Sequence, residues 1–105
     1  MKEIDVKELK ALIESGKEFE LIDVREPHEV EIAEIGGQLV PMATVPQHLD
    51  KFPKNKQVIV YCRSGQRSGN VVRWLEDNHG YENIYNLKGG ILAWADEIDP
   101  SVQKY

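Results

Sequence analysis

Hydrophobic and polar positions change their spacing several times along this chain, and each change predicts a different element. Val6, Leu9, Leu12 and Ile13 recur at helical spacing, and Gly16 follows them. Apolar residues three and four apart form one face of an amphipathic helix, and a glycine just beyond them is a common C-terminal stop. The pattern therefore predicts a first helix that ends at Gly16.

Short apolar runs then alternate with further stretches of helical spacing. The expected strands are residues 19–24, 38–42, 57–61 and 83–87. The expected helices are residues 27–35, a short one through Val45, Leu49 and Phe52, residues 65–79, and residues 91–98. The run 57–61 is the strongest strand, because its β-branched and aromatic residues are unbroken.

This alternation of strands and helices predicts an α/β domain. Strands separated by helices pair in parallel, and helices cover both faces of the sheet. Ligands of such sheets bind at the carboxyl ends of the strands. Three loops should meet at that edge, namely residues 25–26, 62–67 and 88–90.

Composition narrows the class of function. The chain has 105 residues, 41% of them hydrophobic, and a formal net charge of −5. That size predicts one domain with a core that needs no disulfide or metal. The negative charge argues against nucleic acid and anionic membranes as partners. A single cysteine, no secretory leader and no run of membrane-spanning length make the cytoplasm the expected compartment.

Cys62, the only cysteine, holds the candidate chemistry. It follows the strand 57–61, where the chain should turn into solvent, and precedes a predicted helix, so backbone N–H groups and the helix dipole should point toward its thiol. Arg63 and Arg67 add positive potential, which favours a thiolate and a bound anion. The alternatives are a buried cysteine that acts as a small hydrophobe, and arginines that pair with Glu76, Asp77 or other carboxylates.

The neighbouring polar residues fit two roles each. Ser64 suits a helix cap and Ser68 a first-turn position, yet either hydroxyl is able to donate to an oxyanion. Gly65 should let the backbone bend so that successive N–H groups converge. Asp23 ends a strand, where an ion pair or a cap that fixes loops is the preferred role. The three histidines, His28, His48 and His79, have no metal-ligand spacing and predict no metal site.

Three motifs, in this order and spacing, resemble a single-domain rhodanese. They are Leu-Ile-Asp-Val-Arg-Glu-Pro at 21–27, Val-Ile-Val-Tyr-Cys-Arg-Ser-Gly-Gln-Arg-Ser at 58–68, and Asn-Leu-Lys-Gly-Gly-Ile-Leu-Ala-Trp at 86–94. The resemblance covers residues 4–98 of the single domain 1–105. It implies a three-layer α/β fold, with a central, mainly parallel sheet of about five strands and helices on both faces.

The resemblance also implies a thiosulfate sulfurtransferase that needs no metal or organic cofactor. Cys62 would take the outer sulfur of thiosulfate as a persulfide and pass it to cyanide, a thiol or a protein acceptor. The substrate-binding residues would be Arg63, Ser64, Gly65, Gln66, Arg67 and Ser68, with their N–H groups around the sulfur. Asp23 and Arg25 would support this loop.

One segment departs from the family, and several functions compete. Many members carry a Gly-His-Ile-Pro-Gly-Ala-like turn before the third strand, whereas residues 33–38 are Ala-Glu-Ile-Gly-Gly-Gln. A phosphatase or arsenate reductase is disfavoured, because only four residues separate Cys62 from Arg67 and no second thiol is present. The charge of Arg63 favours thiosulfate over mercaptopyruvate. A persulfide relay and a partner-binding module remain as alternatives.

Overall fold

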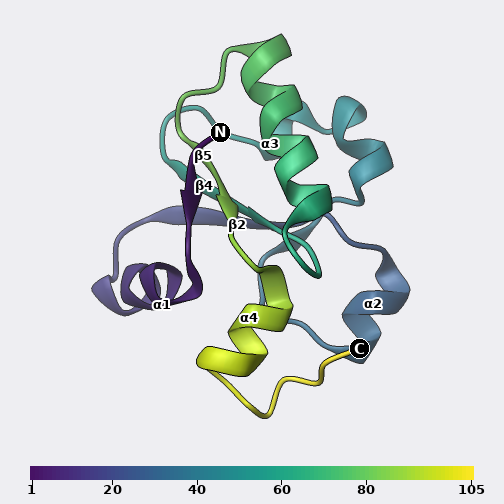
Figure 1. Cartoon of the computed structure of the whole chain (residues 1–105). Coiled ribbons are helices and arrows are strands. Elements are labelled where there is room, and N and C mark those ends of the chain that lie inside the picture. The colour runs from purple at the N-terminus through teal and green to yellow at the C-terminus, as the bar shows by residue number, and fades with distance from the viewer.

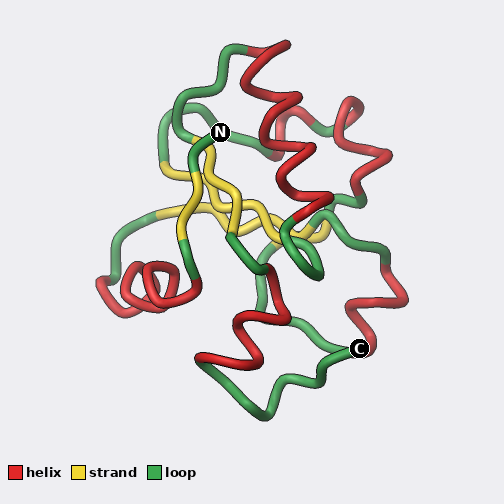
Figure 2. Tube along the Cα trace, in the orientation of Figure 1, coloured by secondary structure: helices red, strands yellow, loops and turns green.

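The computed structural model describes residues 1–105 and has a five-stranded parallel sheet at its centre. In the order β1-β5-β4-β2-β3, the strands run side by side across the sheet. Their bounds are β1 Glu3–Ile4, β2 Phe19–Asp23, β3 Gln38–Leu39, β4 Gln57–Tyr61 and β5 Ile84–Leu87. The predicted α/β class and parallel pairing are therefore confirmed, and Figure 2 shows the strands gathered between the helices.

Helices cover both faces of this sheet. Their bounds are α1 Val6–Ser15, α2 Pro27–Ile32, α3 Gln66–His79 and α4 Gly90–Glu97. Alternate residues of β4 face opposite layers: Val58 and Val60 join the apolar cluster that contains α3 residues, whereas Ile59 and Tyr61 join the one built from α1 and α4. Figure 1 shows α3 on one side of the strands and α1 and α4 on the other. No helix has the length and apolar character needed to cross a bilayer.

Helix ends follow the local signals in the sequence. The side chain of Asp5 caps α1 by accepting from the N–H of Glu8, and Gly16 ends this helix in the left-handed conformation. Gly80 ends α3 in the same way, with φ of 66°. A left-handed residue after the last turn satisfies the final carbonyl groups, and glycine adopts it without steric cost. The predicted ends at Gly16 and Gly80 are confirmed.

Two boundary predictions were wrong, and one short strand was not predicted. The helix predicted over 27–35 ends at Ile32, because Ala33 is extended and its carbonyl accepts from Arg25 Nη2 at 2.9 Å. The strand predicted over 38–42 is only Gln38–Leu39, although the N–H groups of Val40 and Met42 still donate to the carbonyls of Asp23 and Val24 at 2.8 and 3.1 Å. Strand β1 was not predicted, since two residues are too few to show a pattern.

The short helix predicted through Val45, Leu49 and Phe52 is instead a pair of tighter turns. They are the 3₁₀ segments η1 Met42–Gln47 and η2 Leu49–Lys51. Pro46 lies inside η1 and has no N–H to donate, so a regular helix with bonds from residue i to i−4 is not continued there. Val45 and Phe52 are nevertheless buried, as their spacing implied.

The carboxyl ends of β2, β4 and β5 lie at one edge of the sheet, as predicted. Val24 donates to the carbonyl of Tyr61 at 3.0 Å, which ties the loop after β2 to the end of β4. Ile91 and Leu92, in the first turn of α4, donate to the carbonyls of Cys62 and Arg63 at 3.0 and 3.1 Å. The loop that contains Cys62 is therefore held between its two neighbours.

Candidate active site

The loop after β4 surrounds the Cys62 sulfur with hydrogen-bond donors. The N–H of Gly65 lies 3.1 Å from Sγ, and the N–H and hydroxyl of Ser68 lie at 3.4 and 3.3 Å. The chain bends there because Gly65 adopts φ of 100° immediately before α3 begins at Gln66. Three donors that converge on one sulfur favour negative charge on it. The predicted convergence of backbone N–H groups is present.

Cys62 is less exposed than its sequence position suggested. The chain was expected to turn into solvent at this residue, but Cys62 is only 1% exposed and lies in an apolar cluster with Val24 and Val71. The expectation of an open thiol was wrong, because the loop folds back beneath the first turn of α3. Its polar surroundings nevertheless differ from those of an inert core cysteine, because a cysteine that only fills apolar space needs no hydrogen-bond donors around its sulfur.

Gly90 lets α4 approach this loop at backbone distance. A Cβ at Gly90 would lie 2.5 Å from both the Cys62 and the Arg63 carbonyl oxygens, and its φ of +60° is also unfavourable for other residues. The first turn of α4 donates to those same carbonyls. The turn at Gly89-Gly90 thus permits a close approach of α4 to the cysteine loop.

The side chain of Asn86, on β5, holds the loop after β4 in place through hydrogen bonds. It is 2% exposed, accepts from the Ser68 hydroxyl at 2.5 Å and donates to the Gly65 carbonyl at 3.1 Å and to a Glu3 carboxylate oxygen at 3.0 Å. The Ser68 hydroxyl carries one proton, which both Asn86 Oδ1 and Cys62 Sγ are placed to accept. Asn86 therefore fixes the two residues whose groups point at the sulfur.

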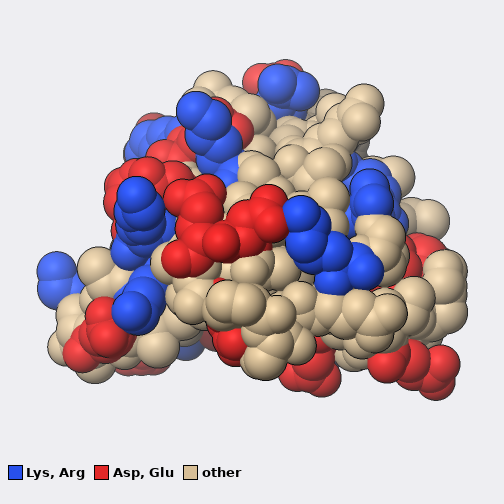
Figure 3. Space-filling view, turned by 60° about the horizontal axis from the view of Figure 1, so that its bottom comes forward, with Lys and Arg blue, Asp and Glu red and all other residues tan.

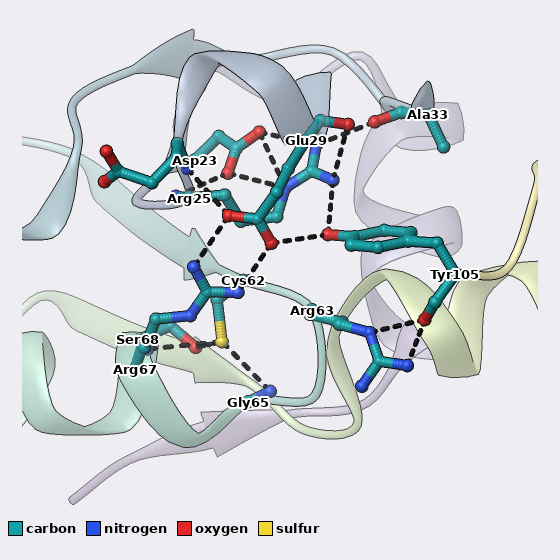
Figure 4. Close-up of polar contacts among 11 residues, drawn as sticks. Asp23, Arg25, Glu29, Ala33, Cys62, Arg63, Gly65, Arg67, Ser68 and Tyr105 are labelled. Atoms are coloured by element: carbon teal, nitrogen blue, oxygen red, sulfur yellow. Dashed lines mark hydrogen bonds and ion pairs between the residues drawn. The ribbon is translucent and has the colours of Figure 1, made fainter. Parts of the chain in front are cut away.

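Arg67 has a carboxylate partner that the sequence did not indicate. Its two terminal nitrogens each donate to a Glu29 carboxylate oxygen at 2.8 Å, so the alternative of an ion pair is realised with Glu29 rather than with Glu76 or Asp77. This hydrogen-bonded pairing lowers the pKa of Glu29 to about 2 and raises that of Arg67. Figure 4 shows the Arg67 guanidinium above the Cys62 sulfur, between it and Glu29.

Asp23 and Arg25 form a buried ion pair on the side of Glu29 that is away from Cys62 (Figure 4). Arg25 is 0% exposed, and its Nε and Nη2 donate to the Asp23 carboxylate at 2.8 to 3.1 Å. Burial opposes the charge on Arg25, but its hydrogen bonds to Asp23 and Tyr105 prevail and raise its pKa. Arg25 also donates to the Ala33 carbonyl. The preferred role of Asp23, an ion pair that fixes loops, is confirmed.

Arg63 points to Tyr105 rather than to Cys62 (Figure 4). Its Nε and Nη2 donate to the main-chain oxygen of Tyr105, and its guanidinium carbon lies 5.2 Å from the centre of the tyrosine ring. Ser64 and Gln66 are exposed and donate no side-chain hydrogen bond to the sulfur. Within the predicted segment, the structure thus brings Gly65, Arg67 and Ser68 to Cys62.

Three residues of the site were not predicted: Glu29, Asn86 and Tyr105. A polar residue within the apolar strand 83–87 was a usable signal for Asn86, because a buried amide needs partners. Glu29 and Tyr105 gave no such signal.

The structure contains no cluster of three or more His, Cys, Asp or Glu side chains suited to a metal ion. Figure 3 brings the bottom of Figure 1 forward, and basic and acidic side chains are interleaved on the face that it shows.

Comparisons with known proteins agree with this geometry. The pattern of the rhodanese-like domain family matches residues 5–97. The Bacillus subtilis protein YtwF is 39% identical over 101 residues, covering 95% of this chain and 96% of its own length. A protein of Allochromatium vinosum named "Sulfurtransferase" is 37% identical over 94 residues, covering 89% and 87%. The crystal structure of a rhodanese-like domain protein from Staphylococcus aureus, 35% identical, superposes with a TM-score of 0.83 over 100% of this chain and 99% of the other.

The chain belongs to the rhodanese-like domain family. Some curated relatives are much longer: the chain spans 38% of an Arabidopsis thaliana protein named "Rhodanese-like/PpiC domain-containing protein 12, chloroplastic". It spans 26% of a Mycobacterium tuberculosis protein named "Probable adenylyltransferase/sulfurtransferase MoeZ". Domains of this family thus occur both alone and as parts of larger chains.

Proposed function

We propose that this protein is a sulfurtransferase that carries sulfane sulfur as a persulfide on Cys62. The observation that carries the proposal is the convergence of the Gly65 and Ser68 N–H groups on the Cys62 sulfur, with the Ser68 hydroxyl proton shared between this sulfur and Asn86. Such donors stabilise a negative sulfur, whether it is the attacking thiolate or the persulfide that follows. Relatives named as sulfurtransferases support the same class of reaction.

Thiosulfate is the proposed small donor, with cyanide or a thiol as acceptor. The Cys62 thiolate attacks the outer sulfur of thiosulfate, the sulfur–sulfur bond breaks, and sulfite leaves with the bonding electron pair. Cyanide then attacks the outer sulfur of the persulfide, which yields thiocyanate and restores the thiolate. No electron is lost or gained overall, so the chain needs no redox cofactor. A reducing compartment such as the cytoplasm would keep the single thiol free.

A persulfide relay to a protein partner is the second candidate. Arg67 is already neutralised by Glu29, so a doubly charged small donor finds fewer free cations at this loop than the sequence suggested. The occurrence of the domain inside longer relatives also suits delivery to a tethered or docked acceptor. Both candidates use the same persulfide on Cys62.

The decisive experiment is intact-mass measurement after thiosulfate treatment. We expect the wild-type protein to gain one sulfur atom, which cyanide removes, and Cys62→Ser to gain none and to lose thiosulfate:cyanide turnover. The serine variant should keep its circular dichroism spectrum, because the hydroxyl fits the same space. Substantial residual turnover in Cys62→Ser, or no adduct on the wild type with thiosulfate or with an organic persulfide, would refute the proposal.

A further inference from the structure

Tyr105 contacts three parts of the candidate site although it lies outside the residues that match the family, 5–97. Its hydroxyl donates to a Glu29 carboxylate oxygen at 2.9 Å and accepts from Arg25 Nη1 at 2.9 Å. Its main-chain oxygen accepts from Arg63, and its ring lies beside the guanidinium groups of Arg63 and Arg25, at 5.2 and 5.8 Å. The half-buried Tyr105 thus anchors the segment 101–105 beside Arg25, Glu29 and Arg63.

Arg63 differs from the other two arginines at this edge of the sheet. Arg25 is paired with Asp23 and Arg67 with Glu29, each at 2.8 Å, whereas no Asp or Glu side chain pairs with Arg63. The charge of Arg63 is therefore not neutralised by an acidic side chain. Two of its three nitrogens, however, already donate to Tyr105, and the tyrosine ring covers one face. Only Nη1 has no hydrogen-bond partner in the chain.

We propose that Tyr105 is a specificity-determining residue that sets how strongly the Cys62 site favours anionic over neutral reagents. A guanidinium binds an oxyanion best through two parallel N–H bonds, and Tyr105 occupies the edge that offers Nε and Nη2. Because Tyr105 also turns Arg63 away from the sulfur, its release would let the long side chain reach an anion beside Cys62 (Figure 4). The inference rests on Cys62 being the nucleophile of the proposed function.

Alkylation of Cys62 tests this without any sulfur transfer. Iodoacetate is an anion and iodoacetamide is neutral, and both form a thioether with Cys62 as iodide leaves. Since Cys62 is the only cysteine, intact mass follows a single site. The rate constant for iodoacetate divided by that for iodoacetamide measures the preference of the Cys62 site for an anion. Tyr105→Ala keeps the main-chain oxygen but loses the ring and the hydroxyl that hold the segment 101–105 against Arg63, so the segment should come away. We then expect the ratio to rise about five- to tenfold, the scale of one charge-assisted hydrogen bond after competition.

Two comparisons show whether Tyr105 acts through Arg63. The matched control is Gln103→Ala in the same segment, an exposed residue without side-chain hydrogen bonds, which should keep the wild-type ratio. Adding Tyr105→Ala to Arg63→Ala should leave the ratio at its Arg63→Ala value. An unchanged or lower ratio in the Tyr105→Ala single variant, or an equal rise with Arg63 absent, would overturn the proposal.

A gentler variant covers the case in which Tyr105→Ala does not fold. Tyr105→Phe keeps the ring and the main-chain oxygen but loses the bonds to Glu29 and Arg25, so the segment is held less firmly and the ratio should rise by about twofold. An unchanged ratio in this variant would then reject the proposal. If neither reagent modifies Cys62 in any variant, the proposed function fails together with the inference. If alkylation occurs with unchanged ratios, only the inference fails.

Discussion

Replacing Glu29 by glutamine would remove the carboxylate that holds Arg67 over the Cys62 sulfur. Glu29 accepts from both terminal nitrogens of Arg67, from the Tyr105 hydroxyl and from the N–H of Glu26, all at 2.8 to 2.9 Å. Glutamine has nearly the same shape and still accepts through one oxygen, so the change mainly removes the negative charge. We therefore expect a loss of stability that depends on pH.

The size of this effect follows from the pKa of Glu29. Hydrogen bonding to Arg67 lowers that pKa from 4.5 to about 2. At about 1.4 kcal/mol per pH unit, the difference corresponds to roughly 3 kcal/mol of free energy of unfolding. The Arg67 side chain is 32% exposed, which weakens the pair. We expect Glu29→Gln to lower the free energy of unfolding at pH 7 by about 2 kcal/mol.

The sign of the pH dependence is fixed by the direction of the pKa shift. Between pH 4.5 and about 2, the unfolded chain binds a proton on Glu29 that the folded chain does not. The stabilisation is therefore complete above pH 4.5 and is lost as the pH falls toward the folded pKa. The expected difference of about 2 kcal/mol between wild type and Glu29→Gln should shrink by roughly 1.3 kcal/mol, well over half, on going from pH 7 to pH 3.5.

Urea unfolding followed by circular dichroism, at several pH values between 7 and 3.5, measures this difference directly. Glu31→Gln is the matched control, because Glu31 lies on the same helix, is exposed and has no hydrogen bond or ion pair. Its free energy of unfolding should stay within about 0.5 kcal/mol of wild type. A Glu29→Gln difference that is absent at pH 7, or constant down to pH 3.5, would show that the ionised carboxylate does not stabilise the fold.

Two further predictions concern the loop itself. Gly90→Ala should cost more than about 2 kcal/mol, because the new Cβ would meet two carbonyl oxygens at 2.5 Å; thermal unfolding measures this. Gly80→Ala, also at positive φ but with no atom within 4 Å, should cost only about 1 kcal/mol, and equal losses would contradict the role of close approach. Ser68→Ala should slow persulfide formation on Cys62 about tenfold or more, as measured by quenched-flow intact mass, whereas Ser68→Thr should retain much of the rate. An unchanged rate in Ser68→Ala would mean that the backbone donors suffice.

The parts of the site that sequence could predict are those that one continuous segment builds. Cys62 and Gly65 lie between a clear strand and a clear helix, and Ser68 lies in the first turn of that helix, so the local pattern alone predicts donors around the sulfur, and the fold has them there. The partners of the arginines come from far along the chain. Glu29 is 38 residues from Arg67, and Tyr105 is 42 residues from Arg63. The spacing of hydrophobic residues predicts which face of a helix or strand is buried, but it does not predict which distant side chain contacts a given residue of that element.

The burial of Cys62 has a similar origin. From sequence, a residue just after a strand and before Arg-Ser-Gly faces solvent. In the fold, the first turn of α4 donates to the Cys62 carbonyl, and the first turn of α3 donates to the thiol. The contact with α4 is tertiary, and it helps to override the exposure that local polarity implies. The bounds of the short strand pairs β1·β5 and β2·β3 were hard to predict for a different reason, because a run of two paired residues shows no hydrophobic pattern.

The surroundings of the Cys62 side chain are built from different interactions on two sides, and this bears on how sulfur would reach it. On one side, α4 N–H groups hold the Cys62 and Arg63 carbonyls, and Asn86 holds the Gly65 carbonyl. On the other side lie charged side chains, namely Arg67 and Glu29, with Tyr105 beside them.

A persulfide adds an atom to a side chain that is 1% exposed, so one side must give way when sulfur arrives. The backbone side is tied by hydrogen bonds and by glycine contacts that leave no free space. Rotation of a long side chain needs only that an ion pair open, and the Arg67 side chain is already 32% exposed. We therefore expect sulfur donors and acceptors to reach Cys62 past Arg67, so that the strength of the Arg67–Glu29 pair sets access as well as charge.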